Sequence, residues 1–246
     1  MRLSCRMCFF AISIARAQSP AADRDVSWKE LIPNILDDQK RLWTFPAQLA
    51  EGKDLLQAAA VVGITTGLAV GVDPMEGRYF RNTNAFHGFN SIFTSNATSL
   101  GMVAVPTVLY ATGFFRKDAK MKNTALLVGE AVADVEILTE ALKTAASRTR
   151  PSSVPLHGNY SDSWTEGSIG SASRASFPSG HAIVAFSIAT VISRRYPGHR
   201  WLPFVAYGLA SAVGFSRMTL SAHFAADVFA GAALGYSVSR FDVLRQ

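Results

Sequence analysis

Long stretches without charged side chains constrain the fold of this chain more than any other feature of its sequence. Residues 54–72 contain one charged side chain, Asp54, and residues 91–115 contain none. Neither stretch alternates apolar and polar residues with the period of two that a half-buried strand requires. Hydrophobic residues make up 49% of the 246, which excludes an intrinsically disordered chain. The sequence therefore predicts an all-α fold, a bundle of about six to seven helices.

The first of these stretches, residues 54–72, should form a helix that is buried on most sides, because it is rich in Ala and Gly. Three of its glycines recur at four-residue spacing, which would let another helix approach closely: Gly63, Gly67 and Gly71. The helix should end at Asp73-Pro74. Residues 74–90 follow, and their Gly, Asn and Arg content indicates a loop.

The clearest amphipathic pattern covers residues 122–149. Its apolar residues recur at steps of three and four: Leu126, Leu127, Ala131, Val135, Leu138 and Leu142. Four carboxylates are expected on the remaining surface: Glu130, Asp134, Glu136 and Glu140. Carboxylates are costly in hydrocarbon, so this segment argues against a purely transmembrane protein. The other expected helices are 91–115, interrupted at Gly101 and Pro106, then 181–193, 201–215 and 222–239.

Residues 152–177 are polar and Ser/Gly-rich, and they show no periodicity, so they should form a long loop. Loops of this length in compact domains are usually functional or disordered. Trp164 and Arg174 are candidate ligand contacts in this loop, which could equally be an ordinary surface loop. Three histidines elsewhere are expected on the surface: His87, His157 and His199.

Residues 1–17 have the order of a secretory signal peptide. A basic start with Arg2 and Arg6 precedes an apolar run, and Ala15-Arg16-Ala17 forms an A-x-A cleavage pattern. The alternatives are an uncleaved amphipathic start and a misassigned initiator codon. Cleavage would remove both cysteines of the chain, so their C-x-x-C spacing does not indicate a redox or metal site.

Cleavage would also halve the net charge. The three arginines of residues 1–17 would leave with the peptide, so the 24 basic residues would become 21 against 18 acidic ones, and +6 would become +3. With no basic run remaining, no nucleic-acid partner is expected. Residues 18–50 are interpreted as an arm packed on the body through Trp28, Trp43 and Phe45. Residues 51–246 are interpreted as a single helical domain.

Three short segments in the second half of the chain carry residues suited to phosphate chemistry. In the first, Lys143 and Arg150 lie seven residues apart, so both should project from one helix face. Pro151 should end the helix there. Taken alone, this is an ordinary basic helix end, which the helix dipole favours anyway.

The second segment, Pro178-Ser179-Gly180-His181, should open an apolar helix. Ser179 is a plausible N-cap, and Gly180 lets a ligand approach the backbone. The free N–H groups of a helix start form an anion site, with His181 at its edge. Taken alone, the segment is a capped helix with an incidental histidine.

The third segment contains Arg217, His223 and Asp227. His223 and Asp227 are one turn apart on the expected helix and therefore share a face. A carboxylate beside an imidazole selects its tautomer and leaves the other nitrogen free as a base or nucleophile. A structural His–Asp pair in a core would use the same hydrogen bond. Arg217 adds donors suited to phosphate. No metal is expected, since no His, Asp or Glu set has metal-site spacing.

Together the segments resemble the signature of the type-2 phosphatidic acid phosphatase and vanadium haloperoxidase superfamily. Its motifs are K-x6-RP, PSGH and SR-x5-H-x3-D, and every fixed position is present in order and spacing between residues 143 and 227. The resemblance covers about residues 122–240.

The resemblance implies that His223 attacks phosphorus and forms a phosphohistidine, with Asp227 hydrogen-bonded to the other ring nitrogen. It implies that His181 protonates the leaving oxygen and then activates water. The implied phosphate-holding groups are Lys143, Arg150, Ser179, the Gly180 backbone N–H and Arg217.

The implied activity is that of a metal-independent phosphatase acting on a phosphate mono- or pyrophosphate ester. A lipid phosphate and a small phosphomonoester both fit as substrate. No cofactor is expected, and vanadate should inhibit. A vanadium-dependent haloperoxidase, in which vanadate is the cofactor, is one alternative, although such enzymes are usually much longer. A non-catalytic phosphate or lipid-headgroup binding protein is the other, but mere binding would not require an intact nucleophile, acid and orienting Asp.

The expected signal peptide indicates a location outside the cytoplasm, in the periplasm or on the outer face of the membrane. The uncharged helices permit an integral membrane protein instead, but several are shorter than the roughly 20 residues of a membrane span. The carboxylates of residues 122–149 and a mean hydropathy of +0.17 favour an exported body that associates with the membrane surface.

Overall fold

The computed structural model describes residues 26–52, 54–164 and 175–244. The expected signal peptide and Arg174 lie outside these ranges. The described residues form nine α-helices and three shorter helical segments, with no strand among them. The α-helices are α2 (Leu31–Ala50), α3 (Leu55–Gly71), α4 (Asp73–Asn82), α5 (His87–Ile92), α6 (Ser95–Phe115), α7 (Ala119–Ala146), α8 (Gly180–Arg195), α9 (Leu202–Thr219) and α10 (Ala225–Ser237). The shorter segments are η3 (Pro151–Ser153), η4 (Tyr160–Trp164) and the π-helical η6 (Val238–Val243). The all-α prediction is confirmed, with more helices than the six to seven expected.

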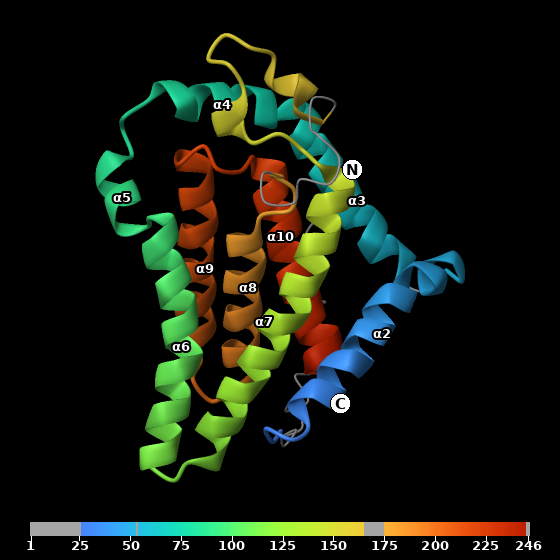
Figure 1. Cartoon of the computed structure of the whole chain (residues 1–246), viewed down its shortest axis with the longest axis vertical. Coiled ribbons are helices and arrows are strands. Elements are labelled where there is room, and N and C mark those ends of the chain that lie inside the picture. Colours follow the sequence, from blue (N-terminus) through green and yellow to red (C-terminus); the bar gives the residue numbers. More distant parts are fainter. Residues whose placement is uncertain (1–25, 53, 165–174, 245–246) are drawn as a thin grey trace, which may run out of the picture.

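The bundle is built around α8, which packs against α7, α9 and α10 (Figure 1). α6 packs along α7, and α2 lies against α7 and η6. α4 crosses one end of the bundle together with the segment that follows α7 (Figure 1). This arrangement brings the C-terminal end of α7, the N-terminal end of α8 and the α9–α10 connection to the same end of the bundle.

The core lies between α7 and α8, where both helices present small and branched apolar side chains. Leu127, Ala131 and Val135 of α7 are fully buried, as the sequence pattern predicts, and Val128 is buried beside them. Removing such side chains from water contributes about 1.5–3 kcal/mol for each large one. This packing provides the rigid frame that carries the functional end of the bundle.

Two of the four carboxylates expected on the surface of α7 are buried instead. Glu130 and Asp134 lie beneath α2, which supplies amide donors to them. Asn34 Nδ2 donates to Glu130 Oε2 at 3.2 Å, and Gln39 Nε2 donates to Asp134 Oδ1 at 2.9 Å. A buried carboxylate is tolerated when donors satisfy it, and the helical pattern alone could not show that another helix brings those donors. Only Glu136 and Glu140 of the four are exposed.

The helix expected over 54–72 forms as α3, but the prediction that it is buried on most sides is wrong. None of its residues is buried, and Leu56 and Val70 are 81% and 76% exposed. Its three regularly spaced glycines have no atom of another element within 4 Å of a Cβ built on them. The close helix approach occurs elsewhere, at Gly231 and Gly235 of α10. A Cβ on Gly235 would lie 2.2 Å from the Ile183 carbonyl oxygen of α8.

Gly235→Ala should therefore destabilise the protein measurably. The added methyl meets backbone rather than a movable side chain, so α10 must shift away from α8. Overpacking of this kind costs about 1–3 kcal/mol, which lowers the melting temperature by about 2–4 °C per kcal/mol in a chain of this size. Gly63→Ala on exposed α3 is the matched control, and it should leave the melting temperature unchanged or slightly raised. Equal melting temperatures for the two variants would contradict the close α8–α10 approach.

The loop predicted over 74–90 contains two helices, α4 and α5. Pro74 begins α4 rather than ending a structure, because proline in a first helical turn loses no hydrogen bond. The interruptions expected at Gly101 and Pro106 are also absent, since α6 is continuous through both. α6 is long and apolar enough to cross a membrane, with a mean hydropathy of 1.4 and 11% of its residues buried over its most apolar window.

Candidate active site

The three signature segments meet at the end of the bundle beneath α4, and backbone hydrogen bonds hold them together (Figure 1). The Ser179 N–H at the start of α8 donates to the Asp227 carbonyl in α10 at 3.0 Å. The Ser176 N–H donates to the Arg148 carbonyl at 2.7 Å, which ties the segment before α8 to the segment after α7. Residues far apart in the sequence therefore occupy one site.

The two cations of the first segment do not share a helix face, contrary to the prediction. α7 ends at Ala146, and Ser147 follows with a left-handed φ of 46°. Arg150 therefore lies beyond the helix, on extended backbone before η3. Lys143 remains on the last turn of α7, where its Nζ is 3.3 Å from Glu140 Oε1. Both cations still lie near the site. In addition to burial, the positive charges of Lys143 and Arg150 lower the pKa of His181.

The PSGH segment begins α8 as expected, with Ser179 at the N-cap position. Ser179 is fully buried, and its Oγ has no hydrogen-bond partner among the described residues. A Cβ built on Gly180 would lie 3.6 Å from Lys143 Nζ. A hydroxyl, the first free N–H groups of α8 and an ammonium group thus converge, and this combination suits an anion.

His181, in the first turn of α8, points toward the start of α6. Its Nε2 lies 3.2 Å from Ser99 Oγ and 3.4 Å from the Ser95 carbonyl oxygen. Burial lowers the pKa of His181 to about 4, and the positive charge of Arg217 contributes to this shift. Sequence reasoning missed both serines, because nothing in the pattern of an apolar helix marks residues that lie beside a distant histidine.

Arg217, near the end of α9, is buried and held by the segment around the start of α6. Its Nη1 donates to Ser95 Oγ at 3.0 Å and its Nη2 to the Phe93 carbonyl at 2.5 Å. Its Nε donates to Ser216 Oγ at 3.0 Å. Burial lowers the pKa of Arg217 to about 10, so the guanidinium stays charged at neutral pH.

His223 lies in the connection between α9 and α10, so the prediction that it shares a helix with Asp227 is wrong. Its ring is buried, and Nδ1 lies 2.6 Å from the Ser176 carbonyl oxygen. A carbonyl can only accept, so Nδ1 carries the proton and Nε2 keeps its lone pair. Burial lowers the pKa of His223 well below its usual value, and Arg150 adds to the effect. The imidazole is therefore neutral.

Asp227, in the first turn of α10, does not make the direct hydrogen bond to His223 that the family resemblance implies. Its Oδ2 is 3.9 Å from His223 Nδ1. That oxygen instead accepts from Ser176 Oγ at 2.5 Å and from the Phe224 N–H at 2.8 Å. Burial raises the pKa of Asp227, and the Arg148 guanidinium opposes the rise. Ser176 is thus the intermediary between the carboxylate and the ring.

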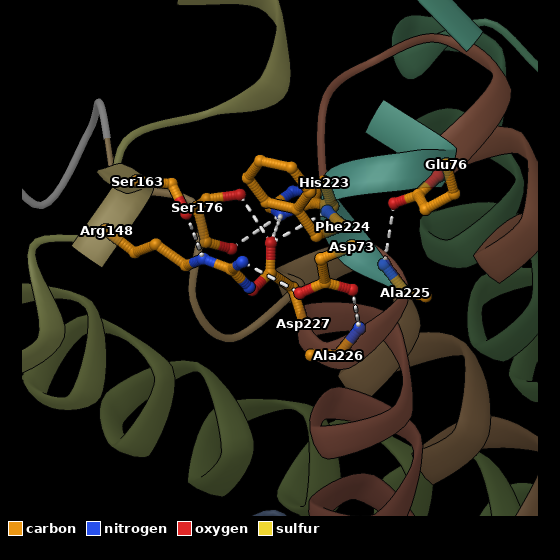
Figure 2. Close-up of polar contacts among 10 residues, drawn as sticks. All are labelled: Asp73, Glu76, Arg148, Ser163, Ser176, His223, Phe224, Ala225, Ala226 and Asp227. Atoms are coloured by element: carbon orange, nitrogen blue, oxygen red, sulfur yellow. Dashed lines mark hydrogen bonds and ion pairs between the residues drawn. The ribbon is translucent and has the colours of Figure 1, made fainter. Parts of the chain in front are cut away.

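Sequence reasoning missed Arg148, which is 1% exposed at the centre of this network (Figure 2). It occupies a variable position of the K-x6-RP motif, so the motif did not single it out. Its guanidinium lies 4.4 Å from the ring centre of Trp164 and 4.1 Å from that of Phe224. Trp164 also packs on Phe177. This candidate ligand contact of the loop therefore packs against other residues of the site.

Two carboxylates of α4 satisfy the N-terminal N–H groups of α10. Asp73 Oδ1 accepts from the Ala226 N–H at 3.0 Å, and Glu76 Oε1 accepts from the Ala225 N–H at 2.9 Å (Figure 2). Burial raises the pKa of Glu76 to about 8, and the negative charge of Asp73 adds to the rise. Burial also raises the pKa of Asp73. Because the sequence predicts a loop over 74–90, it does not predict that a helix there contributes these two carboxylates to the site.

The remaining histidines lie outside this network. His87, His157 and His199 are exposed, as predicted. Within the described ranges, no three His, Cys, Asp or Glu side chains are grouped closely enough to hold a metal ion.

Comparisons with known proteins identify a family and two similar proteins. The family model of the PAP2 superfamily matches residues 123–243. A lipid A 1-phosphatase of Porphyromonas gingivalis is 41% identical over 64 residues, which are 26% of this chain and 14% of that protein. A transmembrane PAP2-type phosphatidylglycerolphosphate phosphatase from Bacillus subtilis has a similar solved structure. The TM-score is 0.41 at 22% identity, over 84% of this chain and 92% of the other.

Proposed function

We propose that this chain, whose residues 123–243 belong to the PAP2 superfamily, is a metal-independent phosphatase that hydrolyses a lipid phosphate through a phosphohistidine intermediate. The observation that carries the proposal is the state of His223. Its imidazole is neutral and buried, its proton is held on Nδ1 by a carbonyl, and its Nε2 retains a lone pair. A nucleophile needs this protonation state, whereas a purely structural histidine does not.

In the first step, the lone pair of His223 Nε2 forms a bond to phosphorus while the bond from phosphorus to the ester oxygen breaks. The Nδ1 proton stays on the ring, which becomes cationic. The Ser176 carbonyl at 2.6 Å and the Asp227 carboxylate at 3.9 Å lie on that side of the ring and stabilise the positive charge. The neighbouring cations keep the ring neutral beforehand, and the two oxygens favour the charge that develops.

His181 is the proposed source of the proton for the leaving oxygen. Burial and the nearby positive charges lower its pKa to about 4, so the ring is neutral before substrate binds. A bound phosphate dianion offsets Arg217, Lys143 and Arg150, so binding raises the pKa of His181 and favours the protonated form. In the second step, neutral His181 takes a proton from water as the water oxygen bonds to phosphorus and the N–P bond breaks.

The phosphoryl oxygens are proposed to lie among Lys143, Arg150, Arg217, the Ser179 hydroxyl and the Gly180 N–H. Phosphoryl transfer depends mainly on positioning and on stabilising charge on these oxygens. The unpartnered, fully buried Ser179 Oγ supports a ligand at this point, because a buried hydroxyl without a partner is costly.

The lipid is proposed as the substrate because α6, which begins at the site, exposes apolar side chains along its length. α6, whose N-terminal turn contacts both His181 and Arg217, exposes several of them: Leu100, Val103, Val108, Phe114 and Phe115. A helix of this length and hydropathy can enter a bilayer, which would bring the site to the membrane surface. We propose an outer-face location, which would follow from export by residues 1–17.

The test is phosphate release by the purified chain in detergent with excess EDTA. We expect release from a lipid phosphate in mixed micelles to exceed release from a soluble phosphomonoester, and vanadate to inhibit both. Release only from the soluble ester would overturn the lipid assignment. Bromide oxidation supported by vanadate and peroxide, with no phosphate release, would instead establish a haloperoxidase. Binding of phosphate without release from any ester would establish a non-catalytic protein.

A further inference from the structure

We propose that Asp73 and Arg148 are positioning residues, forming a buried charge bridge that holds Asp227 and Ser176 so that His223 keeps its proton on Nδ1. The inference rests on the proposed function of His223. Asp73 lies in α4, outside residues 123–243, so the matched family segment is completed by a residue from another part of the chain.

The bridge is a continuous series of short polar contacts (Figure 2). Asp73 Oδ2 is 2.7 Å from Arg148 Nη2, and Arg148 Nη1 is 2.6 Å from Asp227 Oδ1. Asp227 Oδ2 accepts from Ser176 Oγ at 2.5 Å, and the Ser176 carbonyl accepts from His223 Nδ1 at 2.6 Å. The series thus links residues from four separate segments of the chain to a single ring nitrogen, His223 Nδ1.

The shape of the guanidinium explains why an arginine occupies this position. Its two terminal nitrogens bind one carboxylate each, and its Nε donates to Ser163 Oγ at 3.2 Å. Trp164 and Phe224 lie against its faces, so the planar group has one allowed orientation. A lysine ammonium is a compact point charge that lacks the planar fork and cannot reproduce this set of contacts.

The charge of Arg148 also opposes protonation of the carboxylates: burial raises the pKa of Asp73 and of Asp227, and the guanidinium lowers both. Asp73 and Asp227 are both fully buried, and two adjacent carboxylates without a cation would take up a proton. A protonated Asp227 would become a donor toward Ser176 and lose its role as acceptor. Ser176 would then turn, and its carbonyl would no longer be held against His223 Nδ1.

The substitution that tests the bridge is Arg148→Lys, which keeps the charge and removes the fork. We expect kcat to fall about 10–100-fold, the range found when partners behind a reactive group are changed, with KM changed less than about threefold. The acid limb of the kcat/KM profile should move to higher pH, because the pKa of Asp227 rises when the hydrogen bond from Arg148 Nη1 is lost.

Arg195→Lys is the matched control. Arg195 is a buried arginine at the last turn of α8, at the other end of that helix from His181, and its Nε donates to Thr124 Oγ1. We expect its kcat to stay within twofold of the parent. Asp73→Asn is the second variant. It retains an oxygen acceptor for the Ala226 N–H, removes one charge of the bridge and should lower kcat in the same direction.

An independent readout is the tautomer of His223 in the full chain, observed by ¹⁵N NMR with labelled histidine and assigned by loss of the signal in His223→Ala. The parent should show Nδ1–H alone, and Arg148→Lys should show a tautomer mixture. This spectrum decides the positioning role even if no phosphate ester is hydrolysed, so it separates the bridge from the proposed function.

Three results would overturn the proposal. The first is folded Arg148→Lys with parental kcat and an unchanged tautomer. The second is a loss of kcat no greater than that of Arg195→Lys. The third is a change confined to KM, which would place Arg148 on the substrate. If Arg148→Lys does not fold, the same criteria apply to Asp73→Asn.

Discussion

Replacing His223 with alanine should abolish phosphate release, with a loss of at least about 10⁴-fold, since removing a catalytic nucleophile has cost up to about 10⁶ in kcat in a serine protease. No other histidine can take its place, because His181 faces Ser95 and Ser99 and the described histidines outside the signature are exposed. The measurement is phosphate release from a lipid phosphate, together with trapping of an acid-labile phosphoprotein. The parent should form this species, and the variant should not.

The control must separate loss of chemistry from loss of structure. His223→Ala leaves the buried Ser176 carbonyl without its donor, which costs about 1–3 kcal/mol. Thermal unfolding of the variant should therefore remain cooperative at a lower temperature. His199→Ala, at an exposed histidine, should retain parental activity. A folded His223→Ala protein that still releases phosphate at more than one hundredth of the parental rate would disprove the nucleophile.

His181→Asn should reveal general acid catalysis through its dependence on the leaving group. An alkoxide leaves poorly without a proton, so turnover of a lipid phosphate should fall about 10²–10⁴-fold. The phenolate of p-nitrophenyl phosphate leaves without assistance, so formation of the phosphohistidine should be nearly unaffected. Water activation is also lost in this variant. We therefore expect a burst of p-nitrophenol of about one equivalent per enzyme, followed by slow turnover.

The burst distinguishes a chemical role of His181 from a structural one. A variant that had merely lost the shape of the site would slow both substrates alike and show no burst. That outcome would remove His181 from the mechanism while leaving His223 in place. His87→Ala, at another exposed histidine, is the matched control and should match the parent on both substrates.

Much of the candidate site could be predicted from local sequence, because its residues lie at fixed spacings within three short segments. α8 begins at Gly180 with Ser179 at the N-cap position, as the sequence predicts, although the Ser179 side chain makes no capping hydrogen bond. The end of α7 could not be predicted to the residue. Ser147 in the left-handed region stops the helix before Arg150, and residues other than glycine rarely adopt this region, so the sequence does not mark the stop.

The glycines illustrate the same limit. Two sets with four-residue spacing occur in the chain, one on α3 and one at Gly231 and Gly235 of α10. Only the second lies at a close approach of two helices; at the first, no atom of another described element lies within 4 Å of the built Cβ positions. Spacing shows where a close approach is geometrically allowed, but the position of the neighbouring helix decides where it happens.

Sequence by itself therefore determined the helical class, and it singled out the side chains proposed to react and the end of α8 at which the phosphate is proposed to bind. Each follows from interactions within a few residues. Tertiary structure alone decided that Ser176 lies between Asp227 and His223, and that Arg148 and Asp73 stand behind them. These contacts join residues 47 to 79 positions apart, and the low dielectric of the packed interior makes each of them stronger than it would be in water. No spacing rule encodes such a contact, because its energy depends on which other groups the fold has removed from water.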